Sequence, residues 1–485
     1  MLKLRRPIAL AVLASMLFAA ACNNTGGGIT DTEDTSAGIS DTTETTVKEK
    51  EWEYYENLDG LDFGGEYEFT ILSYGGDAWK LYLDADEASN ELLSNAAFKR
   101  NTEVEEMLGV KITEHLANLS EYENLFKNTV LAGDGESFDL LAFYSPGQRA
   151  TYITENLVYD WQSVPYINLD APWYNQSAND NFTIAGKQYF GVSDITFAGQ
   201  QNASVLFNPI IVEEYKLDSP YELVREGKWT LDAFRSYIKN TYVDVDNNSV
   251  KDENDKYGIV SHVNVFGRIM ASTGSIEVTM NEEGFNINMF SDKIVDTFER
   301  VRELAVSSDV FKTSNANLPL QSFMNGNCMF CLYASDPAKL RDVEFDFGYL
   351  PFPKYDEAQE SYITEAAGGM MAIPQNAPNI ERTGAIIEAL SAGSAKYITD
   401  AFVESYIEGK VLRSDDDVEM YRLCRDTYTY NVSYNIDPAD LLASHKYYST
   451  MLNNPSLEIA SYYESIKTQV TKAYDSLWEI AKGND

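Results

Sequence analysis

One acidic segment near the middle of the chain has the residue types and spacing of a calcium-binding loop. Oxygen-bearing side chains stand at positions 1, 3, 5, 9 and 12 of the segment, which are Asp244, Asp246, Asn248, Asp252 and Asp255. Position 7, Val250, offers its backbone carbonyl. The segment departs from an EF-hand loop at Ser249, which replaces the usual Gly, and at Asp255, which replaces a bidentate Glu. It predicts a structural calcium site or, alternatively, an Asx-rich surface turn.

The rest of the sequence offers little catalytic chemistry. It contains 3 His and 4 Cys, which disfavours a zinc or redox enzyme. Walker A, G-x-S-x-G, H-E-x-x-H and G-x-G-x-x-G motifs are absent from the sequence. Cys328 and Cys331 have the spacing of a redox pair, but Met329 and Phe330 between them indicate a buried strand. We therefore expect buried thiols, with a disulfide to Cys424 as the alternative, and neither an enzyme nor a required cofactor.

The charge of the chain excludes some partners. Its 485 residues include 37 Lys+Arg and 76 Asp+Glu, a net charge of −39. A field this acidic repels phosphate backbones and anionic lipid, so we expect no nucleic-acid partner. The length is enough for two or three domains, and the many tyrosines suit surfaces that are both apolar and hydrogen-bonding.

The N-terminus has the pattern of an export signal. Basic residues at Lys3, Arg5 and Arg6 precede an apolar run that ends in Ala19-Ala20-Ala21-Cys22. This run is too short for a membrane span and is typical of a secretory signal over residues 1–21. The end of the run resembles a bacterial lipobox, although Ala19 replaces the usual Leu, and the resemblance implies lipidation of Cys22. Ordinary cleavage after the alanines is the alternative.

A flexible tether is predicted to follow over residues 22–65. Residues 23–50 are rich in Ser, Thr and Gly and have almost no large apolar side chain. Such a segment buries too little surface to offset its chain entropy, so it would let a folded domain stand off a membrane. We expect an exported protein that is lipid-anchored to the outer face of the cytoplasmic membrane.

The folded part alternates strands and helices. Residues 68–73, 110–113 and 138–143 read as strands, and residues 91–108 and 121–131 read as the helices between them. This alternation predicts an α/β fold with a mainly parallel sheet. Further strands are predicted at 187–192, 204–207, 257–261, 328–332, 345–350 and 370–373, and further helices at 210–215, 231–240, 293–307, 383–390, 396–407 and 457–481.

The order of four motifs resembles the extracellular solute-binding proteins, family 1 type, that serve ABC sugar importers. The motifs are Arg100–Glu106 with Val110–Ile112; Ser204–Leu217 with Gly227–Ala233; Phe323–Gly326 with the strand to Leu332; and Gly348–Pro353 with Gly368–Pro374. The resemblance covers roughly residues 65–410. It implies a type II periplasmic-binding-protein-like fold in which two α/β lobes clamp a ligand in the cleft between them. It also implies a carbohydrate ligand, ABC permease partners and a monomer.

The resemblance further implies where the chain crosses between lobes. Crossings are expected near 196–201, 364–368 and 410–416, which gives a first lobe of 66–197 plus 368–412 and a second lobe of 200–364 plus 413–485. The C-terminal helices would then return to the second lobe. Trp161 and Trp229 are expected in the core, with Thr230 capping a helix.

Ligand residues are expected immediately after strands, because open α/β sheets bind ligands beyond the carboxyl ends of their strands. A sugar needs aromatic platforms for its C–H faces and planar polar groups for its hydroxyls. The candidates are Asp77, Trp79, Tyr144, Trp173, Asp194, Gln200, Phe266, Arg268, Tyr333, Asp336 and Glu365. Alternatives are packing for Trp79, Tyr144 and Tyr333, a structural brace for Asp194 and Glu365, and a salt bridge for Arg268.

Two other functions remain open at this point. The same fold could bind a peptide or another small polar solute. A secreted carbohydrate-active enzyme is the third reading, because carboxylate pairs are easily found in so acidic a chain.

Overall fold

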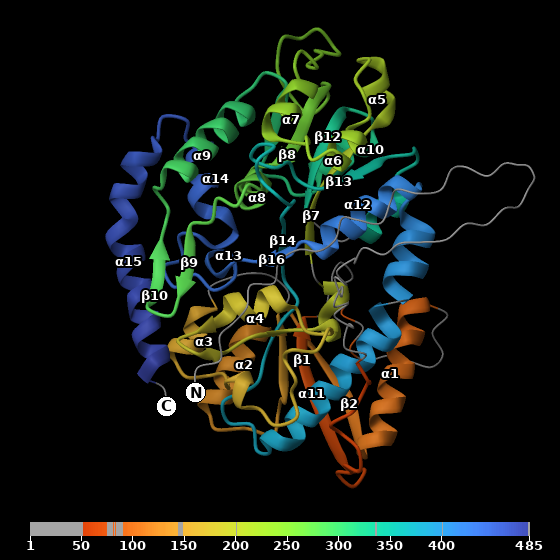
Figure 1. The fold of residues 1–485 in the computed structure, drawn as a ribbon, viewed down its shortest axis with the longest axis vertical. Coiled ribbons are helices and arrows are strands. Elements are labelled where there is room, and N and C mark those ends of the chain that lie inside the picture. The colour runs from red at the N-terminus through yellow and green to blue at the C-terminus, as the bar shows by residue number, and fades with distance from the viewer. Residues whose placement is uncertain are drawn as a thin grey trace, which may run out of the picture. The chain divides into compact units, whose positions relative to one another are not determined.

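The computed structural model describes most of the chain beyond the predicted tether (Figure 1). The described residues are 52–74, 81, 83, 91–143, 149–199, 201–334, 337–399 and 401–483. The segment from Trp52 onward forms one compact unit, built around two separate β-sheets. We refer to the part of the chain around each sheet as a lobe.

The first sheet has five strands in the order β2-β1-β3-β15-β6. Their bounds are β1 Tyr67–Tyr74, β2 Val110–Ala117, β3 Leu140–Phe143, β6 Gly191–Val192 and β15 Met370–Ala372. β1 pairs in parallel with β2 and β3, whereas β15 is antiparallel to β3 and β6. The three strands that the sequence predicted to be parallel are therefore parallel, and the returning strand β15 makes the sheet mixed.

Helices pack around the first sheet. They are α1 Leu92–Leu108, α2 Tyr122–Leu131, α3 Ala150–Thr154, α4 Gln176–Phe182 and α11 Ile380–Ser394. Helix α1 ends where the sequence predicts, because Gly109 adopts a left-handed φ of 61° and its backbone N–H bonds the carbonyl of Glu105. A Cβ at this position would lie 2.1 Å from Oδ1 of Asp62. Trp161 is buried in this lobe, as expected.

The second sheet has seven strands, in the order β11-β8-β12-β7-β14-β16 with β13 also paired to β7. Their bounds are β7 Gln201–Phe207, β8 Tyr257–His262, β11 Val310–Thr313, β12 Cys328–Ala334, β13 Gly348–Leu350, β14 Thr364–Ala367 and β16 Tyr428–Tyr430. β8, β11 and β12 are parallel, and β7 runs antiparallel to β12, β13 and β14. Cys328, Cys331 and Cys424 are buried free thiols, so the alternative disulfide is absent.

The second lobe contains helices of its own. They are α5 Pro209–Glu214, α6 Pro220–Arg225, α7 Leu231–Tyr237, α8 Phe266–Ser272, α9 Asp292–Ala305, α10 Leu318–Met324 and α12 Asp415–Asp426. Thr230 caps α7 by accepting from the backbone N–H of Ala233. The preceding Trp229 is fully buried and donates from Nε1 to the carbonyl of Pro351 over 3.0 Å, which confirms its predicted core position.

Three connections run between the sheets. The first is the 3₁₀ segment η3 Asp194–Gly199 leading into β7, and the second is β14 leading through Gly368 and Gly369 into β15. The third follows α11 as two π-helical segments, η6 Ala395–Thr399 and η7 Ala401–Val411. It leaves α1 and α11 and reaches η5 Pro337–Asp342 in the second lobe. The sequence predicts this crossing near residues 410–416, whereas η6 follows directly after α11.

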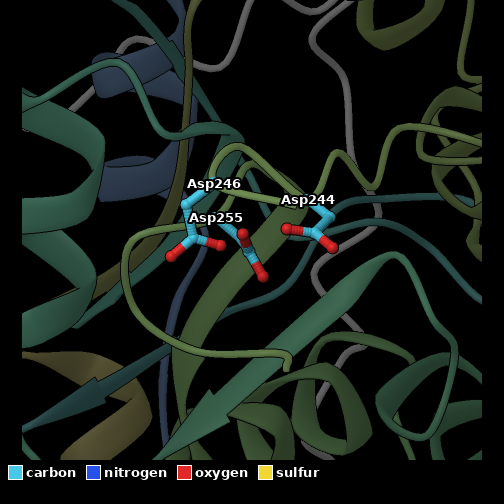
Figure 2. Close-up of side chains that lie close together, drawn as sticks. All are labelled: Asp244, Asp246 and Asp255. Atoms are coloured by element: carbon cyan, nitrogen blue, oxygen red, sulfur yellow. The ribbon is translucent and has the colours of Figure 1, made fainter. Parts of the chain in front are cut away.

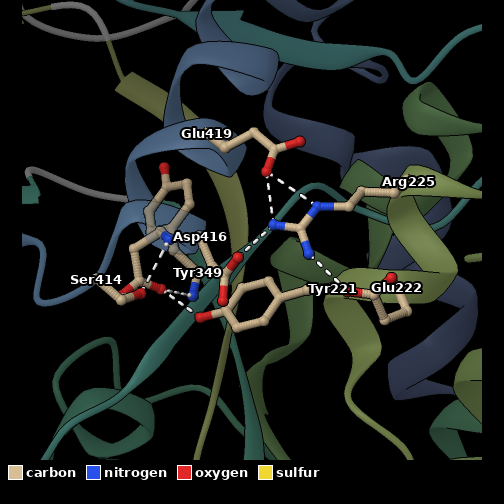
Figure 3. Close-up of polar contacts among 8 residues, drawn as sticks. Tyr221, Glu222, Arg225, Tyr349, Ser414, Asp416 and Glu419 are labelled. Atoms are coloured by element: carbon tan, nitrogen blue, oxygen red, sulfur yellow. Dashed lines mark hydrogen bonds and ion pairs between the residues drawn. The ribbon is translucent and has the colours of Figure 1, made fainter. Parts of the chain in front are cut away.

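The chain enters the second lobe again through α12, which is held by α6. Figure 3 shows Arg225 of α6 pairing with Asp416 and Glu419 of α12, and with Glu222 of its own helix. Beside it, the buried carboxylate of Asp417 accepts hydrogen bonds from the hydroxyl groups of Tyr221 and Ser414 and from the backbone N–H of Tyr349. Acidic residues in the first turn of a helix also complement its dipole.

The C-terminal segment contacts both lobes. It comprises α13 Val432–Asn435, η8 Ala443–His445, α14 Lys446–Asn453 and α15 Ile459–Gly483. Helix α15 packs against β10 of the hairpin β9 Val278–Asn281 and β10 Gly284–Ile287, and also against α3 of the first lobe. The sequence predicts that the C-terminal helices return to the second lobe, and in the structure α15 contacts the first lobe as well. The remaining short elements are η2 Trp161–Ser163, β4 Thr183–Ile184, β5 Lys187–Gln188 and η4 Val263–Val265.

Candidate functional site

The connections between the lobes meet one another in the structure. The hydroxyl of Thr196 in the first connection donates to the carbonyl of Gly369 in the second over 2.5 Å. Phe197 of the first connection meets Phe402 of the third edge to face, with ring centroids 5.4 Å apart. Gly368 and Gly369 both have left-handed backbone, with φ of 73° and 65°, which few other residues adopt. Three touching connections with such a glycine pair form an arrangement that can act as a hinge.

A hollow in the described surface lies beyond the carboxyl end of strand β2 in the first sheet. It has a volume of about 520 Å³ and lies where β2 ends and α2 begins. Its lining is mainly polar and includes His115, Asn118, Ser120, Glu121, Asn124 and Asn128, together with Leu116, which is 60% exposed. The His115 ring packs edge-on against Phe138 at 5.4 Å. Amides, a hydroxyl and an exposed apolar side chain are the groups that a polyhydroxylated ligand can use.

Sequence reasoning did not name the residues of this hollow. They follow the second strand of the first sheet, and the rule that found the other candidates applies equally to them. The segment Asn118–Asn128 is also unusually rich in amides. Asp77 and Trp79, after β1, and Tyr144, after β3, lie outside the described residues. Gln200 and Asp336 also lie outside them. These five candidates stay predictions.

Two predicted ligand residues pair with each other instead. Nη1 of Arg268 lies 3.2 Å from Oε2 of Glu365 and donates to the Glu365 carbonyl over 3.0 Å. Both side chains are buried, with 3% and 1% exposed. His445 Nε2 lies 2.7 Å from the same carboxylate, and the amide of Asn431 donates to its other oxygen. The structure thus favours the alternatives of a brace and a salt bridge over ligand contact.

The electrostatics of this buried group follow from its pairing. Burial by itself would raise the pKa of Glu365, but electrostatic interaction with His445 and Arg268, with hydrogen bonds from His445 and Asn431, holds the pKa below its usual range. Arg268 also donates to the Tyr434 hydroxyl over 2.9 Å. Glu277, buried nearby, has its pKa raised by burial. The cluster joins the second connection to α8 and to the C-terminal segment.

Trp173 is a packing residue in the structure rather than a ligand platform. It is 4% exposed and donates from Nε1 to Oε1 of Glu388 over 3.1 Å. The other oxygen of Glu388 accepts from the Tyr174 hydroxyl at 2.7 Å. Burial raises the pKa of this carboxyl to about 7. The loop after Pro172 folds inward against α11, so that both rings are buried.

The remaining described candidates differ in exposure. Phe266 is fully buried in α8, and Tyr333 is 5% exposed on β12. Asp194 is half-buried at the start of the first connection, where its backbone N–H bonds the carbonyl of Trp173. Asp194 is therefore the candidate among the described residues that retains surface for a ligand.

The predicted calcium loop brings three of its carboxylates together. Figure 2 shows Asp244, Asp246 and Asp255 converging, and one oxygen of each lies within 4.8 Å of the others. An antiparallel bridge between Val243 and Lys256 closes the base of the loop. Three close carboxylates repel one another and supply hard oxygen donors, so these residues fit a divalent cation such as Ca²⁺.

Other features of the loop agree only in part with the prediction. Ser249 takes a left-handed φ of 62°, which is the conformation that the EF-hand glycine normally supplies. Asp244 accepts from the backbone N–H groups of Asn248 and Ser249. Asp252 instead caps a turn by accepting from Asn254, and the Val250 side chain is exposed. Hydrogen bonds from Val245 and Tyr242 hold the pKa of Asp255 below its usual range despite its burial.

Comparison with known proteins identifies the fold. No protein-family model and no curated protein sequence matches the chain. Solved structures do match. A cyclo/maltodextrin-binding protein complexed with maltotetraose has a TM-score of 0.58 and 13% identity, covering 84% of this chain and 97% of that one. An ABC substrate-binding protein from Listeria monocytogenes in complex with cycloalternan has a TM-score of 0.54 and 14% identity, covering 84% and 99%.

A third matching structure belongs to the family that the sequence resembles. A family 1 extracellular solute-binding protein from Bifidobacterium longum subsp. infantis has a TM-score of 0.54 and 14% identity, covering 86% of this chain and 100% of that one. At such identities the likeness is one of fold. The chain has the two-lobe α/β fold of the type II periplasmic-binding-protein class, which confirms the predicted fold class.

Proposed function

We propose that this chain is an extracytoplasmic, lipid-anchored solute-binding protein that captures a carbohydrate by hinge closure and delivers it to an ABC import permease. The observation that carries the proposal is the meeting of the three connections at Thr196–Gly369 and Phe197–Phe402, in a fold whose solved counterparts bind sugars. Two lobes that rotate about such a hinge favour the closed state only through contacts that the ligand makes with both.

The chemistry of the first lobe supports an oligosaccharide as the ligand. The hollow after β2 presents amide groups of Asn118, Asn124 and Asn128 beside the exposed Leu116. Amides both donate and accept, so they suit hydroxyl groups, and an apolar neighbour suits a C–H face. The acidic net charge of −39 disfavours an anionic solute. A peptide or another small polar solute is the alternative ligand for the same fold.

The N-terminal sequence supports the proposed anchoring. Cys22 lies directly after the predicted export signal, and residues 22–51, which include most of the predicted tether, lie outside the described residues. No described helix has both the length and the apolar character to cross a membrane. We propose that lipid on Cys22 holds the protein at the outer face of the cytoplasmic membrane, where it acts as a monomer.

A glycan library tests the proposed function against its rivals. We expect reversible binding of one oligosaccharide class to the exported chain, with the sugar recovered intact. Recovery of shortened sugars would instead identify a carbohydrate-active enzyme. No binding to any member of the glycan library, together with tight binding of peptides, would identify a peptide as the ligand.

We also propose that the loop from Asp244 to Asp255 holds one structural Ca²⁺. The convergence of Asp244, Asp246 and Asp255 supports this, because a divalent cation would relieve the repulsion among them. The ion would fasten the loop in front of β8 and would take no part in ligand binding.

A further inference from the structure

The last part of the segment that the sequence predicted to be a flexible tether packs on the first lobe, so the prediction is wrong for residues 52–63. Trp52 meets Trp173 edge to face with ring centroids 6.0 Å apart, and Tyr54 stacks on the same ring at 5.9 Å. Further along, the backbone N–H of Phe63 bonds the carbonyl of Leu108 at the end of α1. Residues 52–63, which we call the clasp, therefore bind to the lobe by ring packing and by a backbone hydrogen bond.

The clasp also reaches one of the hinge connections. The hydroxyl of Tyr55 donates to Oε2 of Glu103 on α1 over 3.1 Å. Lys396, in the first turn of the third connection, places its Nζ 2.7 Å from Oε1 of the same carboxylate and 5.6 Å from the centroid of the Tyr55 ring. One carboxylate thus joins the clasp, α1 and the third connection.

Backbone geometry indicates that this contact is built into the fold. Tyr55 has a φ of 67°, a left-handed conformation that costs free energy for a residue with a Cβ and persists where surroundings enforce it. Across the contact lies Gly393 at the end of α11, where a Cβ would come within 2.9 Å of the Tyr55 hydroxyl. A larger residue at 393 would push the clasp away from the connection.

We propose that the clasp braces the hinge: it couples the tether-bearing end of the chain to the third connection and so biases the opening and closing of the lobes. The proposal rests on the proposed function for the movement of the lobes. Lys396 leads within a few residues to Phe402, which packs against Phe197 of the first connection. A rotation at the hinge must therefore shift Lys396 relative to Glu103 and Tyr55, or carry the clasp with it.

Spin labels on the two lobes test this coupling in the full chain without any ligand. Lys111→Cys on β2 and Lys239→Cys after α7 provide exposed label sites. Cys22→Ser removes the N-terminal thiol, and the native thiols at 328, 331 and 424 are buried. Lys396→Met and Tyr55→Phe each break the brace, the second by loss of a single oxygen. Lys127→Met is the matched control, because it removes a lysine–carboxylate pair with Glu155 in the same lobe, away from the connections.

The expected result is a change in the ratio of short to long label distances of about fivefold or more in both brace variants, within the usual range of coupling between distant elements. The control keeps the distribution of the parent chain. Unchanged distributions in Lys396→Met and Tyr55→Phe would overturn the proposal. Because Tyr55→Phe preserves the ring, the measurement stays informative if Lys396→Met folds poorly.

Hydrogen exchange supplies an independent check on the clasp itself. We expect the Phe63 amide, which bonds Leu108, to be protected in the parent chain. Exchange of this amide and of residues 52–62 at unprotected rates would contradict the clasp. Neither measurement uses a sugar, so failure of the brace is distinguishable from failure of carbohydrate binding.

Discussion

Glu365 and His445 stand 80 positions apart in the sequence and 2.7 Å apart in the fold, both almost completely buried. Glu365 lies in β14, three residues before the Gly368–Gly369 pair that leads back to the first sheet. Ser444 and His445 both have left-handed backbone, with φ of 55° and 60°. The C-terminal segment thus holds a strained residue against a strand that connects the lobes.

Removal of one partner from this buried group is expected to be costly. Glu365→Gln leaves Arg268 without its counter-charge in the core, and we expect the free energy of unfolding to fall by about 3–5 kcal/mol. Denaturant unfolding monitored by circular dichroism measures the change. The control is Glu303→Gln, which breaks an exposed pair with Arg235 and should cost about 1 kcal/mol or less. Equal losses in the two variants would contradict the buried brace.

Glu388 gives the chain a specific pH dependence. Its folded pKa of about 7 lies above its ordinary value of 4.5, so the folded state binds the proton more tightly than the unfolded state. The stability that this group contributes is therefore greatest at acidic pH, falls as pH rises from about 4.5 to about 7, and is level above that range. The shift corresponds to about 3 kcal/mol.

The Glu388→Gln variant isolates this effect. It keeps an acceptor for Tyr174 and Trp173 but no longer titrates, so the difference in unfolding free energy between parent and variant should change across that pH interval. A constant difference from pH 4.5 to 8 would show that Glu388 titrates normally. Urea unfolding at a series of pH values makes the measurement.

Calcium is expected to raise the melting temperature of the parent chain. At a calcium concentration a hundred times the dissociation constant, the ion adds about 2.7 kcal/mol of stability. Asp246→Asn should abolish the shift, whereas Glu253→Gln, an exposed acid outside the convergent set, should leave it intact. Scanning calorimetry with calcium, magnesium and chelator tests this. Absence of calcium heat and of any chelator effect would remove the site.

The hollow after β2 is expected to contribute to ligand affinity. Asn118→Ala and Asn124→Ala each remove one hydrogen-bonding amide at the edge of the first sheet. We expect about tenfold weaker sugar binding in each, with unfolding unchanged. Titration calorimetry measures the affinity. Asn254→Ala, in the exposed loop of the second lobe, is the control; parent-like affinity in all three variants would place the ligand elsewhere.

Sequence patterns predicted the sheets better than the site. The strands around Ile71, Leu141 and Phe330 are short apolar runs that must be buried, so their positions were recognisable from local pattern. Strand β14 was missed, because its buried Glu365 reads as a surface residue. The partners that permit this burial, Arg268 and His445, are remote in sequence, and local pattern carries no information about them.

The helix ends show the same division. Thr230 and Gly109 were predictable because caps are local chemistry. The π-helical form of residues 395–399 and 401–411 was not, since their apolar spacing suits an α-helix equally well. The burial of Trp173 was not predictable for a related reason: an aromatic residue after a proline suits a rim or a core, and its hydrogen-bond partner Glu388 is remote in sequence.

The distance between the lobes in the presence of sugar tests the central claim most directly. Spin labels at Lys111→Cys and Lys239→Cys should report a single shorter distance when the full chain is saturated with an oligosaccharide that it binds, and the original distance should return when the sugar is removed. Tight binding of a sugar with no change in the distance between the labels would contradict capture by hinge closure.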